Sequence, residues 1–221
     1  MSSIELIAVV EGKTEKTFID EVLAPVLCGR GIYMRATILK KPGQSGGDVK
    51  FARVQKDIGN HLKQRDNTYV TLLVDFYGID SKWPNLDAAR AKRTPHDKAN
   101  CFTEDLLGRI SESFPDRDPA NRFIPYVAMH EFEAMLFSDP EILANAIGVD
   151  KSAVTEILEE CDGPEDINDS STTAPSKRLH GLSTTFKKTT TGIDIAKKIG
   201  VDAIRQACPL FDQWLGRIEA L

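Results

Sequence analysis

The stretch Ile4-Glu5-Leu6-Ile7-Ala8-Val9-Val10-Glu11-Gly12 decides the fold, because a short and mostly apolar run ends abruptly at an acid and a glycine. Such a run is typical of a strand buried on both faces, as strands of parallel sheets are. Phe18, Val22 and Val26 follow on one apolar stripe at helical spacing. The chain therefore begins with a strand, a tight turn and a helix.

The same pattern recurs along the chain. Three further strands are predicted at residues 34–39, 69–74 and 123–129. Helices are predicted between them, at residues 51–62 and 102–110. Pro125 lies in the last of these strands, which favours an edge position or a bulge because proline cannot donate a ladder hydrogen bond. Residues 78–96, rich in proline and charge, are expected to form a loop. This alternation predicts an α/β fold, a Rossmannoid and mostly parallel sheet flanked by helices.

Beyond residue 137 the pattern becomes mainly helical. Ser138-Asp139-Pro140 is a good helix start, and residues 162–176 have the composition of a long loop. Phe211, Trp214, Leu215 and Ile218 mark a closing helix that packs back on the body. We therefore expect an α/β core at 1–137 and a helical C-terminal extension at 138–221, packed on that core.

Composition indicates a globular protein, since 41% of the 221 residues are hydrophobic and 28% are charged. The formal net charge of −5 gives no overall attraction to nucleic acid, so any such contact must be local. No apolar run approaches the roughly 20 residues of a membrane helix, and the first residues lack the pattern of a leader. We expect a cytoplasmic protein with no membrane partner. The four cysteines lack zinc-ligand or disulfide spacing.

Three common catalytic motifs are excluded by spacing. Gly12-Lys13-Thr14 ends like a P-loop, but the first glycine of that motif would fall at Ile7. His130-Glu131 begins like a zinc-protease helix, but the second histidine would fall at Ala134. No Gly-x-Ser-x-Gly elbow occurs. ATP binding by a P-loop, zinc-dependent proteolysis and serine hydrolysis are therefore not indicated.

Two acids follow directly on predicted strands, Glu11 and Asp75. The carboxyl ends of strands form the crevice where open α/β sheets bind ligands. Two neighbouring buried carboxylates are costly unless a cation or protons neutralise them. Mg²⁺, or Mn²⁺ in its place, prefers oxygen ligands and is usually held by one or two carboxylates plus phosphate. We expect such an ion at this edge.

Further acids could complete the site. Glu15 lies one helical turn after Glu11 and could point to the same space, although a first-turn acid favoured by the helix dipole is an equal alternative. Alternation would place Glu131 and Glu133 on one face if the extended conformation continues. His130 is either a proton carrier or a structural histidine. Asp80 fits an ordinary loop aspartate better than a ligand.

Four ordered motifs resemble the domain-of-unknown-function family 4276, a Toprim-like family. They are Val10-Glu11-Gly12-Lys13-Thr14-Glu15, Val74-Asp75-Phe76-Tyr77-Gly78, His130-Glu131-Phe132-Glu133-Ala134-Met135-Leu136-Phe137, and Pro175-Ser176-Lys177-Arg178-Leu179 with the closing Cys208-Pro209-Leu210-Phe211-Asp212-Gln213-Trp214-Leu215. The resemblance extends over nearly the whole chain. It implies kinship with the Toprim domains of topoisomerases, primases and overcoming-lysogenization-defect nucleases, in which a Glu and an Asp-x-Asp pair bind Mg²⁺ for phosphoryl transfer.

Transferred to this sequence, the resemblance makes Glu11 the first acid and Asp75 the second. Tyr77 replaces the second Asp of the pair, so another ligand is needed, and Glu15, Glu131 or Glu133 could supply it. The candidate catalytic residues are then Glu11, Asp75, His130, Glu131, Glu133 and Lys177. The candidate phosphate or nucleic-acid contacts are Lys13, Lys177, Arg178 and Lys188.

Two functional hypotheses follow from the resemblance. The first is a Mg²⁺-dependent nuclease or nuclease subunit that hydrolyses phosphodiester bonds of nucleic acid, in antiviral defence of bacteria against phage with an ATPase partner. The second is a non-catalytic Toprim-like module that binds a partner ATPase or a nucleotide, which Tyr77 and the acidic balance favour. Self-association into a homo-oligomer is left open by the sequence.

Overall fold

The computed structural model describes residues 4–41, 44–45, 49–129, 131–167 and 173–221. Short 3₁₀ and π segments, labelled η, alternate with α-helices and strands. In chain order the elements are β1 (Ile4–Val10), α1 (Lys13–Phe18), η1 (Ile19–Leu23), α2 (Ala24–Cys28), β2 (Ile32–Ile38), β3 (Lys40–Lys41), β4 (Gln44–Ser45), α3 (Phe51–Leu62), β5 (Thr68–Asp75), η2 (Phe76–Gly78), α4 (Leu86–Arg90), α5 (Pro95–Ser113), η3 (Pro115–Arg117), α6 (Pro119–Arg122), β6 (Phe123–Ala128), η4 (Phe132–Ser138), α7 (Pro140–Ile147), α8 (Lys151–Glu159), η5 (Pro164–Asp166), α9 (Pro175–Leu182), η6 (Lys188–Gly192), α10 (Ile193–Ile199), α11 (Val201–Ala207) and α12 (Pro209–Glu219).

The main sheet has four parallel strands in the order β2-β1-β5-β6. From Leu6 to Val10, β1 has no exposed surface, as its apolar sequence predicts for a central strand. Pro125 lies in β6 at the edge of the sheet, where its missing N–H costs least. The α/β fold with an all-parallel sheet is therefore confirmed.

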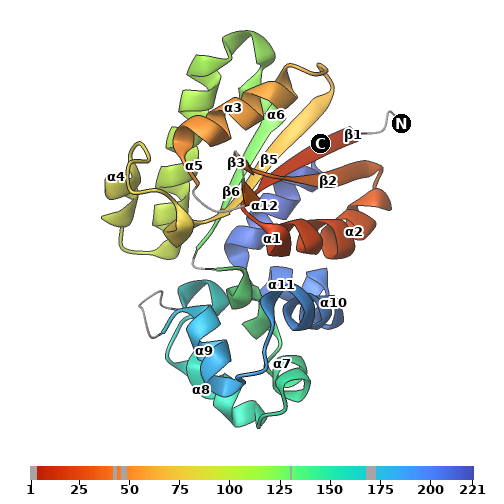
Figure 1. Ribbon diagram of the computed structural model, residues 1–221, viewed down its shortest axis with the longest axis vertical. Helices are drawn as coiled ribbons and strands as arrows, with labels where there is room; N and C mark the ends of the chain where they lie inside the picture. The colour runs from red at the N-terminus through yellow and green to blue at the C-terminus, as the bar shows by residue number, and fades with distance from the viewer. Residues whose placement is uncertain (1–3, 42–43, 46–48, 130, 168–172) are drawn as a thin grey trace.

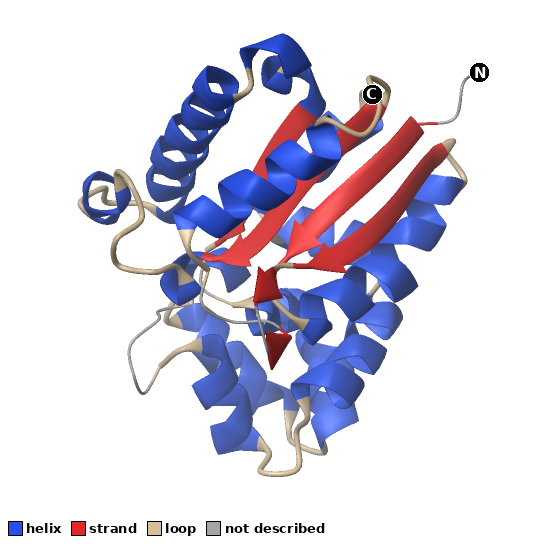
Figure 2. Ribbon diagram, turned by 45° about the horizontal axis from the view of Figure 1, so that its top comes forward, coloured by secondary structure: helices blue, strands red, loops and turns tan. Residues whose placement is uncertain are grey.

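Helices cover both faces of this sheet. In Figures 1 and 2, α3 and α5 lie over one face, while η1, α2 and α12 lie over the other. The rings of Phe18 in α1 and Phe211 in α12 are 6.2 Å apart, which places these two distant segments in one layer. Right-handed crossovers produce this arrangement in parallel sheets.

The helices from α7 to α11 lie beyond the carboxyl ends of the strands (Figure 1). As its sequence predicts, α7 begins after Asp139, whose Oδ1 accepts a hydrogen bond from the Ile142 N–H at 2.9 Å. The last helix, α12, returns to the sheet, where Trp214 Nε1 donates to Thr71 Oγ1 at 2.9 Å. The C-terminal third thus packs against the edge where the predicted site residues lie.

Two predicted loops contain more structure than the sequence indicated. The segment 78–96 includes α4, whose Leu86 and Ala89 are buried, and α5 already begins at Pro95. The segment 162–176 includes η5, and α9 begins at Pro175, while 168–172 lie outside the described residues. Short helices of this kind form through tertiary packing rather than intrinsic propensity, so polar composition hid them.

No helix in the described ranges is both long enough and apolar enough to cross a membrane.

Candidate functional site

Glu11 and Asp75 lie at the carboxyl ends of β1 and β5, which are neighbouring strands. After β1 the chain turns into α1 on one face, and after β5 it leads to α5 on the opposite face. Loops that leave adjacent strands in opposite directions open a crevice at the topological switch point, where α/β sheets bind ligands. The sheet therefore brings these two acids to a binding edge.

Two more carboxylates join them around Lys188. Lys188 Nζ lies 3.0 Å from Glu133 Oε2 and 3.8 Å from Glu15 Oε1. Glu133 is only 2% exposed and Glu15 only 5%, so both are buried acids and neither is a solvated surface residue. Asp75 and Glu11 lie within electrostatic range of the same lysine. We call Glu11, Glu15, Asp75 and Glu133 the acidic cluster.

Burial and mutual repulsion disfavour the ionised forms of three of these acids. Desolvation raises the pKa of Glu11, and the charge of Glu15 raises it further, while Lys188 and a main-chain hydrogen bond at Asp75 lower it. The pKa of Asp75 is raised well above its ordinary value by desolvation of its carboxyl group and by the charges of the other acids, against the lowering effect of Lys188. Burial also raises the pKa of Glu133. For these three acids, desolvation and repulsion together outweigh the attraction of Lys188.

Lys188 is the first residue of η6, and its positive charge lowers the pKa of each of the three acids Glu11, Asp75 and Glu133. Burial alone would lower its pKa, but Glu133, Asp75 and Glu15 raise it above its ordinary value. The lysine is therefore charged and compensates part of the negative charge. One third of its side chain, 33%, remains exposed.

Three carboxylate oxygens of the cluster are buried without a hydrogen bond among the described residues, but one of them, Glu133 Oε2, forms an ion pair with Lys188. Glu11 Oε2 and Asp75 Oδ1 are buried without a partner among the described residues. A buried polar atom without a partner costs about 1–3 kcal/mol, more when charged, so such atoms often mark a ligand position. Unpartnered oxygens from two adjacent strand ends suit a hard cation such as Mg²⁺ or Mn²⁺.

Only a few protein side chains are placed to bind Mg²⁺ directly at this site. Among the described residues, no three His, Cys, Asp or Glu side chains converge as a ready-made metal cage. Mg²⁺ sites commonly use one or two carboxylates and complete their octahedron with water and substrate phosphate. Glu11 and Asp75 can supply such a pair, and Glu15 and Glu133 stand beside them.

Gly78 makes room for Glu11, a role that sequence reasoning missed. A Cβ on Gly78 would lie 3.0 Å from Glu11 Oε2 and 3.3 Å from Oε1. The glycine directly after Asp75-Phe76-Tyr77 was a visible signal for this close approach. Tyr77 itself is half-buried, with its ring edge-on to that of Phe76 at 5.3 Å.

The prediction that Glu131 and Glu133 share one face is wrong. The chain turns into the 3₁₀ segment η4 at Phe132 instead of continuing as a strand. Glu133 points into the acidic cluster, whereas Glu131 Oε2 accepts a hydrogen bond from the Ser176 N–H at 2.9 Å, at the start of α9. Glu131 thus positions α9. His130 lies outside the described residues.

The predicted phosphate contacts occupy different environments. Lys13 at the start of α1 and Lys177 in α9 are exposed. Arg178 pairs with Glu160 at 2.8 Å and donates to the Thr173 carbonyl at 3.0 Å. Asp80 Oδ1 accepts from the Lys82 N–H at 2.9 Å, as an ordinary loop aspartate does.

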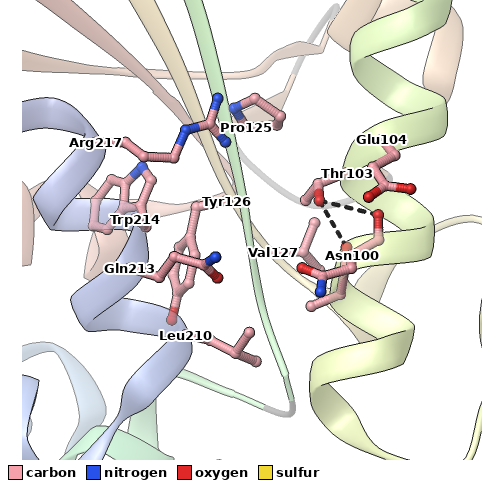
Figure 3. Close-up of a pocket in the computed structure, with 11 residues that line it drawn as sticks. Asn100, Thr103, Glu104, Pro125, Tyr126, Val127, Leu210, Gln213, Trp214 and Arg217 are labelled. Carbon is pink, nitrogen blue, oxygen red and sulfur yellow. Dashed lines mark hydrogen bonds between the residues drawn. The ribbon is translucent and has the colours of Figure 1, made fainter.

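A pocket elsewhere on the sheet is distinct from the cluster. It has a volume of about 250 Å³ and lies along β6, between α5 and α12 (Figure 3). Tyr126 and Trp214, stacked at 4.7 Å, and the amides of Asn100 and Gln213 line it. No carboxylate of the acidic cluster contributes to its wall. The charge-bearing candidate site is therefore the edge of the sheet and not this pocket.

A family model described as "Domain of unknown function (DUF4276)" matches residues 10–219. That range includes Glu11, Glu15, Asp75, Glu133 and Lys188. No curated protein and no solved structure matches the chain.

Proposed function

Because the chain belongs to the DUF4276 family, whose description assigns no activity, we propose from the acidic cluster that it is a Mg²⁺-dependent Toprim-type nuclease or nuclease subunit. It would be a hydrolase acting on phosphodiester bonds of nucleic acid. The roles in antiviral defence and with an ATPase partner, which the resemblance implies, belong to this proposal. The observation that supports it most is the pair of buried, unpartnered oxygens on Glu11 and Asp75.

Glu11 and Asp75 would hold the ion, with Glu15 and Glu133 as further carboxylates. When bound, Mg²⁺ would polarise the scissile phosphate, lower the pKa of an attacking water and stabilise the leaving oxygen. Hydrolysis forms a bond from the water oxygen to phosphorus and breaks the bond from phosphorus to one ester oxygen, and one proton of the water ends on that leaving oxygen, which departs as an alcohol. The protein's contribution is a fixed set of partly or fully buried carboxylate oxygens that would orient the reacting groups.

The lysines would receive the substrate. Lys13 and Lys177 are exposed and suit contact with the nucleic-acid backbone, whose binding is dominated by phosphate charge. Lys188 lies within the cluster and could reach the scissile phosphate, where charge develops in the transition state. These lysines would provide local positive charge for the substrate in a chain whose net charge is −5.

A second candidate function rests on Lys188. Its ammonium group already neutralises part of the cluster, and Tyr77 stands where Toprim enzymes have a second Asp. A site compensated by a lysine needs no metal to be stable. The alternative is therefore a non-catalytic module that binds a partner ATPase or a nucleotide.

Cleavage assays separate the two. Purified protein is incubated with plasmid DNA, single-stranded DNA and RNA in Mg²⁺, Mn²⁺ or EDTA. We expect metal-dependent cutting by the wild type and a loss of at least ~100-fold, about 2.7 kcal/mol, in Glu11→Gln and in Asp75→Asn. Asp80→Asn is the matched control, since this acid lies five residues after Asp75, where its carboxylate accepts from the Lys82 N–H instead of joining the cluster. It should cut like the wild type.

The contrary outcomes are equally clear. Cutting that survives in both cluster variants would show that the activity arises elsewhere or from a contaminant. If no substrate is cut under any condition, while the protein captures a nucleotide or an ATPase without metal, the binding module replaces the nuclease.

A further inference from the structure

The position of Lys188 relative to the four carboxylates has a consequence for ion binding. Its Nζ lies 3.0 Å from Glu133 Oε2 and 3.8 Å from Glu15 Oε1, and the charges of Asp75 and Glu11 act on the same site. Four acids therefore face one ammonium group. The lysine is thus held by the negative charge of the cluster, with Glu133 closer to it than Glu15.

A divalent ion held by Glu11 and Asp75 would lie beside this ammonium group and would draw on Glu15 and Glu133, the carboxylates that the lysine pairs with. Carboxylate oxygens are the protein ligands that Mg²⁺ and Mn²⁺ prefer, and cations close together in a partly buried site repel strongly. A lysine ammonium that remained between Glu133 and Glu15 would therefore oppose the ion. The side chain has a route outward, because 33% of it is exposed.

We propose that Lys188 holds the place of the divalent ion in the ion-free protein and withdraws its ammonium group from the carboxylates when the ion binds. This inference rests on the proposed metal-dependent function. It explains how a buried acidic cluster stays compensated before metal enters, since a buried charge without a partner is severely destabilising. It also implies that η6, which begins at Lys188, shifts on ion binding and frees the lysine for a substrate phosphate.

Metal binding without nucleic acid tests the competition directly. Mn²⁺ affinity is measured by calorimetry and by the free Mn²⁺ signal in electron paramagnetic resonance, for wild type, Lys188→Gln and Lys187→Gln. Lys187 is the exposed neighbour and the matched control. We expect Lys188→Gln to bind Mn²⁺ about tenfold more tightly and Lys187→Gln to bind as the wild type does.

A second measurement needs no variant and so does not depend on how a variant folds. Wild-type protein is acetylated briefly with and without Mn²⁺, and modification of each lysine is followed by mass spectrometry. Mn²⁺ should raise the modification rate of Lys188 at least threefold relative to Lys187.

The outcomes distinguish the inference from the function beneath it. Unchanged or weaker Mn²⁺ binding by Lys188→Gln, or a Lys188 that Mn²⁺ protects from acetylation, would overturn the place-holding role and leave the metal site standing. If Mn²⁺ binds neither the wild type nor the variant, the metal site fails, and this inference fails with it.

Discussion

The buried acid Glu165 gives a prediction in which two physical effects oppose each other. Its Oε2 accepts a hydrogen bond from the Leu210 N–H at 2.9 Å and its Oε1 from the Phe211 N–H at 3.0 Å, so the side chain caps α12. Burial raises the pKa of Glu165 to about 7, while the two main-chain donors lower it. Desolvation is the larger effect.

The sign and size of the stability change follow from this pKa. An acid whose pKa rises on folding keeps its proton in the folded protein over a pH range in which the unfolded chain has lost it. Stability is therefore greatest below pH 4.5, the ordinary value, and falls as the pH rises to about 7. At ~1.4 kcal/mol per pKa unit, Glu165 alone would remove about 3 kcal/mol across this window.

Urea denaturation from pH 4.5 to pH 8 measures this loss in the wild type and in Glu165→Gln. The amide resembles the protonated acid and does not ionise, so we expect the two proteins to be similar at pH 4.5. At pH 8 the variant should be more stable than the wild type by about 3 kcal/mol. Glu159→Gln, at an exposed site, should follow the wild type. Parallel pH profiles for wild type and Glu165→Gln would refute the reasoning, and a wild type that gains stability towards neutral pH would show that helix capping outweighs desolvation.

Three glycines provide further tests. A Cβ at Gly59 would lie 2.2 Å from the ring of Phe114, so Gly59→Ala should cost about 1–3 kcal/mol in urea denaturation. In contrast, Gly108→Ala in the exposed middle of α5 meets no atom within 4 Å and should stabilise by ~0.5–1 kcal/mol; equal effects at the two sites would contradict the packing argument. In Gly78→Ala the added Cβ would lie 3.0 Å from Glu11 Oε2 and displace this carboxylate. The variant should bind Mn²⁺ and cleave nucleic acid about tenfold less well, with a loss of unfolding free energy of at most ~1 kcal/mol. A variant with wild-type Mn²⁺ affinity would show that Glu11 does not hold the ion.

The fold was largely predictable from hydrophobic pattern. The apolar run at Ile4–Val10 is interrupted by one acid only, and strands of that composition are stable only inside a sheet. Pro125 correctly indicated an edge strand. The short helix α4 was missed, because packing of Leu86 and Ala89 stabilises it and its local sequence does not.

The site was predictable where it depends on strand ends and unpredictable where it depends on turns. The sequence by itself determined that Glu11 and Asp75 reach the same edge, because both follow buried parallel strands and such strands end together. It did not determine that Glu131 and Glu133 diverge, since the turn into η4 is set by the packing of the residues that follow.

Tertiary structure alone decided what compensates these acids. Lys188 follows a stretch with no periodic pattern, and nothing local to it indicates a position between Glu15 and Glu133. Its place depends on how the C-terminal helices pack over the sheet edge, a contact between segments far apart in the chain. The local hydrophobic pattern of the sequence determines which residues end a strand, whereas long-range packing determines which residue pairs with a buried charge.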